Sequence, residues 1–171
     1  METWDAICAR RNVRTFSDRP IAEADLHRIL EAGRRAPSAR NTQPWDFVVV
    51  AEPARLVQLA KVWQGAGHIA HSAATIAIAA PNATDARQAG LIQFDLGQAS
   101  MVMAVAAADL GIGSGHAAVA DQDLARSLLG IPETHHLAFL LALGYPADKP
   151  LVPLKRMDRR RFDDVVHRER W

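Results

Sequence analysis

The sequence contains one cysteine, Cys8, among its 171 residues. A disulfide framework within the chain is therefore excluded, which fits a reducing cytoplasm, the compartment that we expect. Cys8 lies in an apolar helical pattern, so we interpret it as a structural side chain. The first five residues, Met-Glu-Thr-Trp-Asp, have neither a basic start nor an apolar run. The sequence thus predicts no signal peptide.

An excess of charge and a long apolar run are also missing. Twenty Lys and Arg residues face nineteen Asp and Glu residues, giving a net charge of +1, so the charge balance does not favour nucleic acid as a partner. The longest apolar stretches, at 73–80 and 101–108, fall short of the ~20 residues that a membrane span requires. We therefore expect no membrane partner. No repeat or linker divides the chain, which predicts a single domain over residues 1–171.

Two motifs that could indicate a metal or a dinucleotide are incomplete. His68 and His71 lack a third ligand at a recognised spacing, so we expect no metal and interpret both as ordinary polar residues of a helix. The alternative for His68 is that it lines a substrate pocket together with Trp63 and Gln64. The glycine-rich run at 111–115 follows a helical pattern, whereas a Rossmann fingerprint follows a strand. We interpret this run as a turn that ends the preceding helix.

Helical and strand patterns alternate along the chain. Residue spacing predicts helices over 4–10, 22–35, 88–110 and 121–129, a further helix that begins at Pro53, and strands over 46–51, 73–80 and 137–143. This order indicates a sheet protein with two or three layers. The helix at 88–110 is rich in Ala and Met and is expected to be buried on most sides. After Lys149 the chain becomes proline-rich and basic, which predicts an extended arm. Val165, Val166 and Trp171 are its candidates for docking on a partner.

The two most informative segments lie near the N-terminus. Residues 10–14, Arg-Arg-Asn-Val-Arg, place three guanidinium groups within five positions, and arginine forks suit phosphate oxygens. Residues 36–45, Ala-Pro-Ser-Ala-Arg-Asn-Thr-Gln-Pro-Trp, form a polar turn before a strand, and such a loop suits the polar edge of a planar ligand. Together they predict a cofactor that carries both a phosphate and an aromatic ring.

These segments resemble those of the FMN-dependent nitroreductases, which have an Arg-Arg-Ser-x-Arg-like motif followed by Ala-Pro-Ser-x-x-Asn-x-Gln-Pro-Trp. The first segment departs at Asn12, where Ser is usual, but Asn keeps a donor and an acceptor. The resemblance runs from about residue 7 to residue 171. It implies an α+β, nitroreductase-like fold, with a central mixed or antiparallel sheet flanked by helices. It also implies a long buried helix at a dimer interface, a swapped C-terminal arm, and reduced helical insertions before the long helix.

The resemblance implies that the N-terminal segment binds FMN. Arg10 and Arg14 would pair with the phosphate, while Arg11 and Asn12 would line the flavin. A solvated helix end is the plain alternative for a lone arginine.

Two further segments would complete the site. Ser38 and Asn41 would bond to the ring or ribityl chain of a flavin held mainly by the other subunit, and Arg35, one turn earlier, is a further candidate. In the C-terminal arm, Arg159 or Arg160 would close over the phosphate.

The glycine-rich turn would bring backbone groups near flavin N5. Gly115, His116, Ala117 and Ala118 are the candidates, because small residues let the backbone approach the ring. A backbone amide there would stabilise the charge that develops on hydride transfer.

The resemblance implies a homodimeric oxidoreductase with two FMN sites at the interface. NADH or NADPH would reduce the flavin, and a small acceptor such as a nitroaromatic or a quinone would then be reduced by a ping-pong mechanism. No catalytic side chain is needed. The remaining alternatives are a reductive dehalogenase, an enzyme that fragments reduced flavin, a flavin-binding protein without turnover, and a structural dimer without flavin.

Overall fold

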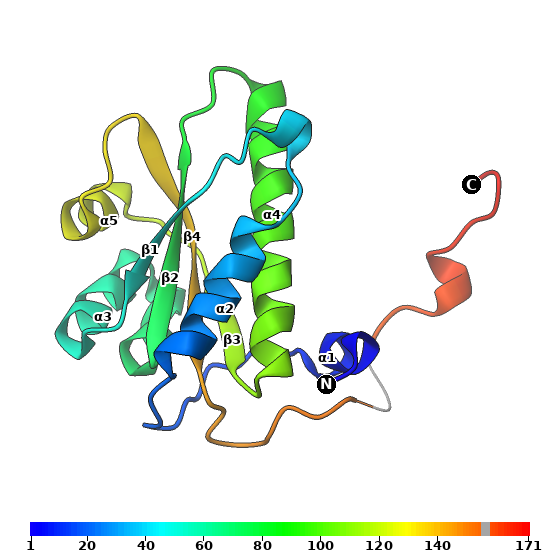
Figure 1. Ribbon diagram of the computed structural model, residues 1–171. Coiled ribbons are helices and arrows are strands. Elements are labelled where there is room, and N and C mark those ends of the chain that lie inside the picture. Colours follow the sequence, from blue (N-terminus) through cyan, green and yellow to red (C-terminus); the bar gives the residue numbers. More distant parts are fainter. Residues whose placement is uncertain (155–157) are drawn as a thin grey trace.

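The computed structural model describes residues 1–154 and 158–171 (Figure 1). The elements are α1 (Thr3–Ala9), α2 (Glu23–Arg34), η1 (Ala39–Asn41), β1 (Asp46–Val50), α3 (Pro53–Leu59), η2 (Ala60–Val62), η3 (Gln64–His71), β2 (Ala74–Pro81), α4 (Ala86–Asp109), β3 (Gly113–Ala117), α5 (Gln122–Leu129), β4 (His135–Gly144) and η4 (Phe162–Asp164). All five predicted helices and the three predicted strands are confirmed, with ends shifted by at most two residues.

The sheet has the order β1-β2-β4-β3, and each neighbouring pair of strands is antiparallel. The predicted α+β fold is thus confirmed, and of the two sheet types expected, the antiparallel one is present. β2 and β4 lie in the centre, and every residue of β2 except the last is buried. A strand that is covered on both faces has a nearly continuous apolar sequence. For this reason β2 and β4 could be predicted from the sequence.

Helices cover both faces of the sheet (Figure 1). Along β2, Ile76, Ile78 and Ala80 belong to a core shared with α2 and α4. Ala77 and Ala79 belong to the opposite core, shared with α3, η3 and α5. This alternation follows from the two-residue period of a strand, and it gives three layers.

The long helix α4 is buried on one side and exposed on another. Ile92, Leu96 and Met103 lie in the core between α2 and the sheet. The opposite surface carries large apolar side chains that are between 37% and 67% exposed, namely Leu91, Phe94, Met101 and Val102. The prediction that this helix is buried on most sides is therefore wrong for a single chain. We call these four residues the apolar face of α4.

By length and composition alone, α4 could cross a membrane. Its most apolar window of 18 residues has a mean hydropathy of 1.4, and half of that window is buried within the protein. The core helix of a globular domain passes the same test, so this is weak support for a span. The sequence analysis considered only uninterrupted apolar stretches. It therefore did not identify α4 as a candidate span, because Gln93, Asp95 and Gln98 interrupt the apolar sequence of this helix.

The glycine-rich run is a strand and not a turn. Gly111, with a φ of 73°, ends α4, and β3 begins two residues later. On one side β3 pairs with β4. On the other side it meets the N-terminal segment, since Asn12 forms a parallel bridge with Ser114 and the Val13 amide donates to the Ser114 carbonyl at 2.9 Å. This pairing places the arginine-rich segment along the edge of the sheet.

Residues 158–171 of the C-terminal arm extend away from the body of the molecule (Figure 1). Phe162, Val165, Val166 and Trp171 are all exposed, and Trp171 is 99% exposed. The predicted extended arm is confirmed as far as residues 150–154 and 158–171 are concerned, while Lys155–Met157 lie outside the described residues.

Candidate functional site

A cavity of about 450 Å³ brings together residues that the sequence assigned to the cofactor. Arg14 from the N-terminal segment lies with His116, Ala117 and Ala118, about a hundred positions later in the chain. Arg14 lies near these three residues because the N-terminal segment pairs with β3. We call it the arginine–histidine cavity, and its lining is Arg14, Trp63, Gln93, Gly97, Ser100, His116, Ala117, Ala118, Ala138 and Phe139.

Arg10 and Arg14 share one side of the extended N-terminal segment. The Arg10 charge, together with a larger effect of burial, lowers the pKa of His116. The Arg14 charge likewise adds to burial in lowering the pKa of His68. Both guanidinium groups therefore act on the histidines around the cavity. In an extended chain, alternate residues point the same way, so this is the expected placement.

Arg11 points elsewhere. Its Nη2 donates to Asp148 Oδ1 at 3.1 Å and to the Lys149 carbonyl at 2.6 Å. The sequence assigned this side chain to the flavin, but it instead ties the N-terminal segment to the start of the C-terminal arm. The partner lies 137 positions away, which no local pattern indicates.

His68 is buried beside the arginine–histidine cavity, and Trp63, its partner in the alternative pocket lining, is one of the lining residues. We interpreted it as an ordinary polar residue of a helix, but it is only 9% exposed and lies in the 3-10 helix η3. Its Nε2 has no hydrogen-bond partner among residues 1–154 and 158–171. A Cβ added to Gly115 would lie 3.3 Å from this atom. His68 therefore packs behind the part of β3 that leads into the cavity.

The residues assigned to the second segment are held by local bonds. Ser38 Oγ accepts a hydrogen bond from the Gln43 amide at 2.9 Å and closes the loop. Asn41 has a φ of 56°. Arg35 Nε lies 2.6 Å from Glu31 Oε1, and hydrogen bonds from Arg34 and Arg35 lower the pKa of Glu31 to about 2.

This loop and the arginine–histidine cavity lie on different sides of α4. The loop is anchored where the Ala39 amide donates to the buried carboxylate of Asp95, at 3.0 and 3.2 Å from its two oxygens. Gly97 and Ser100, which line the cavity, are roughly 160° and 140° around the helix from Asp95 at 100° per residue. One copy of the chain therefore does not place Ser38 and Asn41 in its own cavity.

The two arginines of the arm are also outside the cavity. Arg159 Nη1 donates to the neighbouring Asp158 carbonyl at 2.6 Å, and Arg160 donates to the Asp164 carbonyl. Both are exposed.

A model of the nitroreductase family matches residues 7–145 of this sequence. The chain belongs to the nitroreductase family. An Archaeoglobus fulgidus protein, provisionally named NADH dehydrogenase/NAD(P)H nitroreductase, is 33% identical, with 99% of each chain covered. An NADH dehydrogenase of Thermus thermophilus is 28% identical, covering 92% of this chain and 95% of the relative. This nitroreductase-family protein is thus an oxidoreductase, as the sequence predicted.

Solved structures confirm the fold. The NADPH:FMN oxidoreductase from Vibrio harveyi, complexed with NAD⁺, superposes with a TM-score of 0.85 at 22% identity, covering 97% of this chain and 76% of that one. Nitroreductase A from Vibrio parahaemolyticus has a TM-score of 0.85 at 23% identity, covering 97% and 74%.

Three partly buried histidines predict a pH dependence of stability. Burial lowers the pKa of His68, His116 and His136. As the pH falls below the ordinary value near 6.5, the unfolded chain therefore takes up protons that the folded chain resists. The free energy of unfolding should decrease between pH 7.5 and pH 5.5, as measured with urea. His136→Asn should reduce this slope, and an unchanged free energy across the range would contradict the prediction.

Proposed function

We propose that the chain is an FMN-dependent oxidoreductase that uses NADH or NADPH to reduce small electrophilic acceptors. The arginine–histidine cavity carries this proposal, because it joins Arg14, which forms no ion pair among residues 1–154 and 158–171, to a stretch of small residues. When bound, FMN would supply hydride transfer from the nicotinamide to the acceptor, in two half-reactions that share one site. Cys8 being the only cysteine, we place the enzyme in the reducing cytoplasm.

The residues present fit this cofactor. Arg10 and Arg14 supply the charge that a phosphate needs. His116, Ala117 and Ala118 line the cavity, and backbone amides there would stabilise negative charge on a ring.

Two neighbouring assignments, Arg11 and Asn12, complete the flavin site. Arg11 contributes its backbone, since its side chain is bound to Asp148. Asn12 lies beside Ser114 at the sheet edge and offers both a donor and an acceptor to the flavin.

We further propose that the enzyme works as a homodimer. The apolar face of α4 lies between the arginine–histidine cavity and the loop that begins at Pro37. A shallow depression over this face is bordered by Pro37 from the loop and by Gln93, which also lines the cavity. A contiguous apolar surface of this kind is typical of an interface. A second copy docked there would bring its own Ser38, Asn41 and Arg35 toward the cavity, and its arm would carry Arg159 or Arg160.

The first experiment is an absorbance spectrum of the purified protein, with the released cofactor identified by mass. We expect flavin bands and FMN. Oxidation of NADH and of NADPH is then followed with a quinone or a nitroarene as the acceptor. A colourless protein that also refuses added FMN would overturn the proposal, and flavin without turnover would leave only a binding protein.

One relative favours a second candidate activity. The chain is 28% identical to the 5,6-dimethylbenzimidazole synthase of Rhodospirillum rubrum, over 93% of its own length and 90% of the relative's. If this chain fragments flavin, reduced FMN in air should lose its absorbance irreversibly. Recovery of the full oxidised flavin spectrum after each turnover supports the reductase instead.

Complementation tests whether the site is shared between two copies. Arg14→Gln should disable the cavity and Asn41→Ala the loop, so each variant alone should show little activity. Mixed dimers would contain one site built from two intact segments, and random exchange should restore about a quarter of the wild-type activity. If mixing restores nothing although the copies exchange, both segments serve the same chain and the shared site is wrong.

A further inference from the structure

His68 carries a buried nitrogen atom that no step of the proposed function uses. Two buried polar side-chain atoms have no hydrogen-bond partner within residues 1–154 and 158–171, and one of them is His68 Nε2. The residue is 9% exposed. A buried polar atom without a partner costs free energy, so its presence calls for an explanation. The position of His68 beside the arginine–histidine cavity suggests that the explanation lies in the ligand of that cavity.

The groups that face the ring act on its charge in opposite directions. A Cβ added to Gly115 of β3 would lie 3.3 Å from Nε2. Backbone groups of Gly115 and Gly65 favour the protonated ring, and they must be carbonyls, because an imidazolium only donates. The charged side chain that acts on the ring, among those of the described residues, is Arg14, and it opposes the protonated form. His71, the other titratable residue of η3, is exposed.

The free protein therefore holds His68 as a neutral ring near pH 7. Burial, and to a smaller extent the Arg14 charge, lower the pKa of His68, whereas the two carbonyls raise it. Burial and the carbonyls are properties of the fold, which a ligand does not alter. The repulsion from Arg14 is different, because this side chain lines the cavity and an anion bound there would balance its charge.

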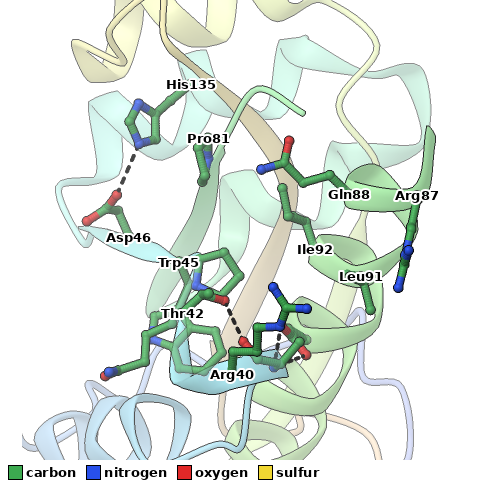
Figure 2. A pocket seen from close by; sticks show the side chains of 14 residues that line it. Arg40, Thr42, Trp45, Asp46, Pro81, Arg87, Gln88, Leu91, Ile92 and His135 are labelled. Carbon is green, nitrogen blue, oxygen red and sulfur yellow. Dashed lines mark hydrogen bonds and ion pairs between the residues drawn. The ribbon is translucent and has the colours of Figure 1, made fainter. Parts of the chain in front are cut away.

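The arginine–histidine cavity is also where an anion meets no opposing charge. The part of the chain that the structure describes contributes Arg14 to this lining and neither Asp nor Glu. The larger cavity of about 720 Å³ differs in this respect (Figure 2). Its arginines, Arg40 and Arg87, are balanced by Asp46 and Asp95, and it lies at the proposed dimer interface. An anionic ligand is therefore expected beside Arg14.

We propose that His68 takes up a proton when an anionic cofactor binds beside Arg14, and that the protonated ring then fixes strand β3. The proton comes from solvent, and the only covalent change is the new N–H bond. Nε2 can then donate to the Gly115 carbonyl, in the strand that leads to His116 and Ala117 at the cavity. His68 is thus a positioning residue that acts through β3. The inference rests on the proposed function, because the anion that it names is FMN.

This coupling gives the FMN affinity a pH dependence of known sign. Binding raises the proton affinity of His68, so a proton must in turn raise the affinity for FMN. Lowering the pH from 7 toward 5.5 should therefore strengthen binding in the wild type relative to His68→Asn. Protonation of the FMN phosphate, whose second pKa is about 6, acts in the opposite direction. It does so equally in both proteins, so the comparison between them isolates His68.

Calorimetric titration of the full-length apoprotein with FMN tests the proposal. At about pH 6, two buffers that differ in their heat of ionisation report the protons taken up for each FMN bound. The wild type should take up about half a proton more than His68→Asn, since the ring then passes from mostly neutral to mostly charged. His71→Asn, which removes an exposed histidine of the same 3-10 helix, should match the wild type. Equal uptake by the wild type and His68→Asn, both binding FMN, would overturn the inference.

A second measurement needs neither FMN nor a variant of His68. In the free protein, NMR signals of the His68 ring report the pH at which it titrates. Arg14→Gln should raise that pH because it removes the opposing charge, and inorganic pyrophosphate should raise it in the wild type. Arg11→Gln should leave it unchanged, since the Arg11 side chain is bound to Asp148.

The outcomes separate this inference from the proposed function. A titration of His68 that responds neither to Arg14→Gln nor to pyrophosphate would overturn the coupling, whether or not FMN binds. If both changes raise the titration while the protein refuses FMN, the proposed function fails and the coupling of His68 to an anion beside Arg14 stands.

Discussion

Replacing Gly115 with alanine should lower the Tm and remove bound FMN together. An added Cβ would lie 2.4 Å from the carbonyl oxygen of Val13. That oxygen belongs to the backbone and cannot rotate away, so the N-terminal segment must move. Overpacking of this kind costs up to about 3 kcal/mol, which corresponds to a Tm decrease of roughly 6–12 °C in a chain of this size.

The loss of FMN follows because the displaced segment carries Arg10 and Arg14. We expect the variant to fold at low temperature, where circular dichroism reports the Tm and the absorbance spectrum reports the bound flavin. Gly90→Ala is the matched control, since an added Cβ there meets nothing within 4 Å. This change in α4 should stabilise the protein by about 0.5–1 kcal/mol. A Gly115→Ala protein with an unchanged Tm and full flavin content would contradict the packing that we describe.

The same glycine shows where sequence patterns reach their limit. Helical spacing predicted α2 and α4, and continuous apolar runs predicted β2 and β4, because those signals are local. Residues 113–117 contain no β-branched residue, and they overlap the glycine-rich run at 111–115 that we interpreted as a turn. This segment is a strand because β4 and the N-terminal segment pair with its two edges. Its glycines make room for Val13 of the same chain, a contact that no local pattern contains.

In the candidate site, too, some residues were predicted from the sequence and others were not. The motifs pointed to Arg14 and His116, and the structure places both at one cavity. The motifs also indicated Arg11, but its side chain is instead hydrogen-bonded to Asp148. The burial of His68 against Gly115 went unforeseen. Motifs thus identify which segments meet, whereas the direction of each side chain depends on partners far away in the sequence.

The second large effect concerns Arg14. Arg14→Gln should weaken FMN binding about 10- to 150-fold, because a hydrogen bond to a charged group contributes roughly 1.5–3 kcal/mol. The guanidinium lies at the arginine–histidine cavity, and glutamine keeps much of the length of the side chain but neither the charge nor the fork. Fluorescence titration of the apoprotein with FMN measures the dissociation constant.

Arg11→Gln is the sharpest control, because it removes an identical charge three positions away. The Arg11 side chain is bound to Asp148 and to the Lys149 carbonyl, so its loss should loosen the start of the C-terminal arm while the FMN affinity changes by less than about threefold, the scale of an exposed pair. Raising the salt concentration should reduce the difference between wild type and Arg14→Gln, since an exposed part of the phosphate contact is screened. If Arg11→Gln weakens FMN binding as much as Arg14→Gln does, the affinity depends on the total charge of the segment and not on the side of the strand that each arginine occupies.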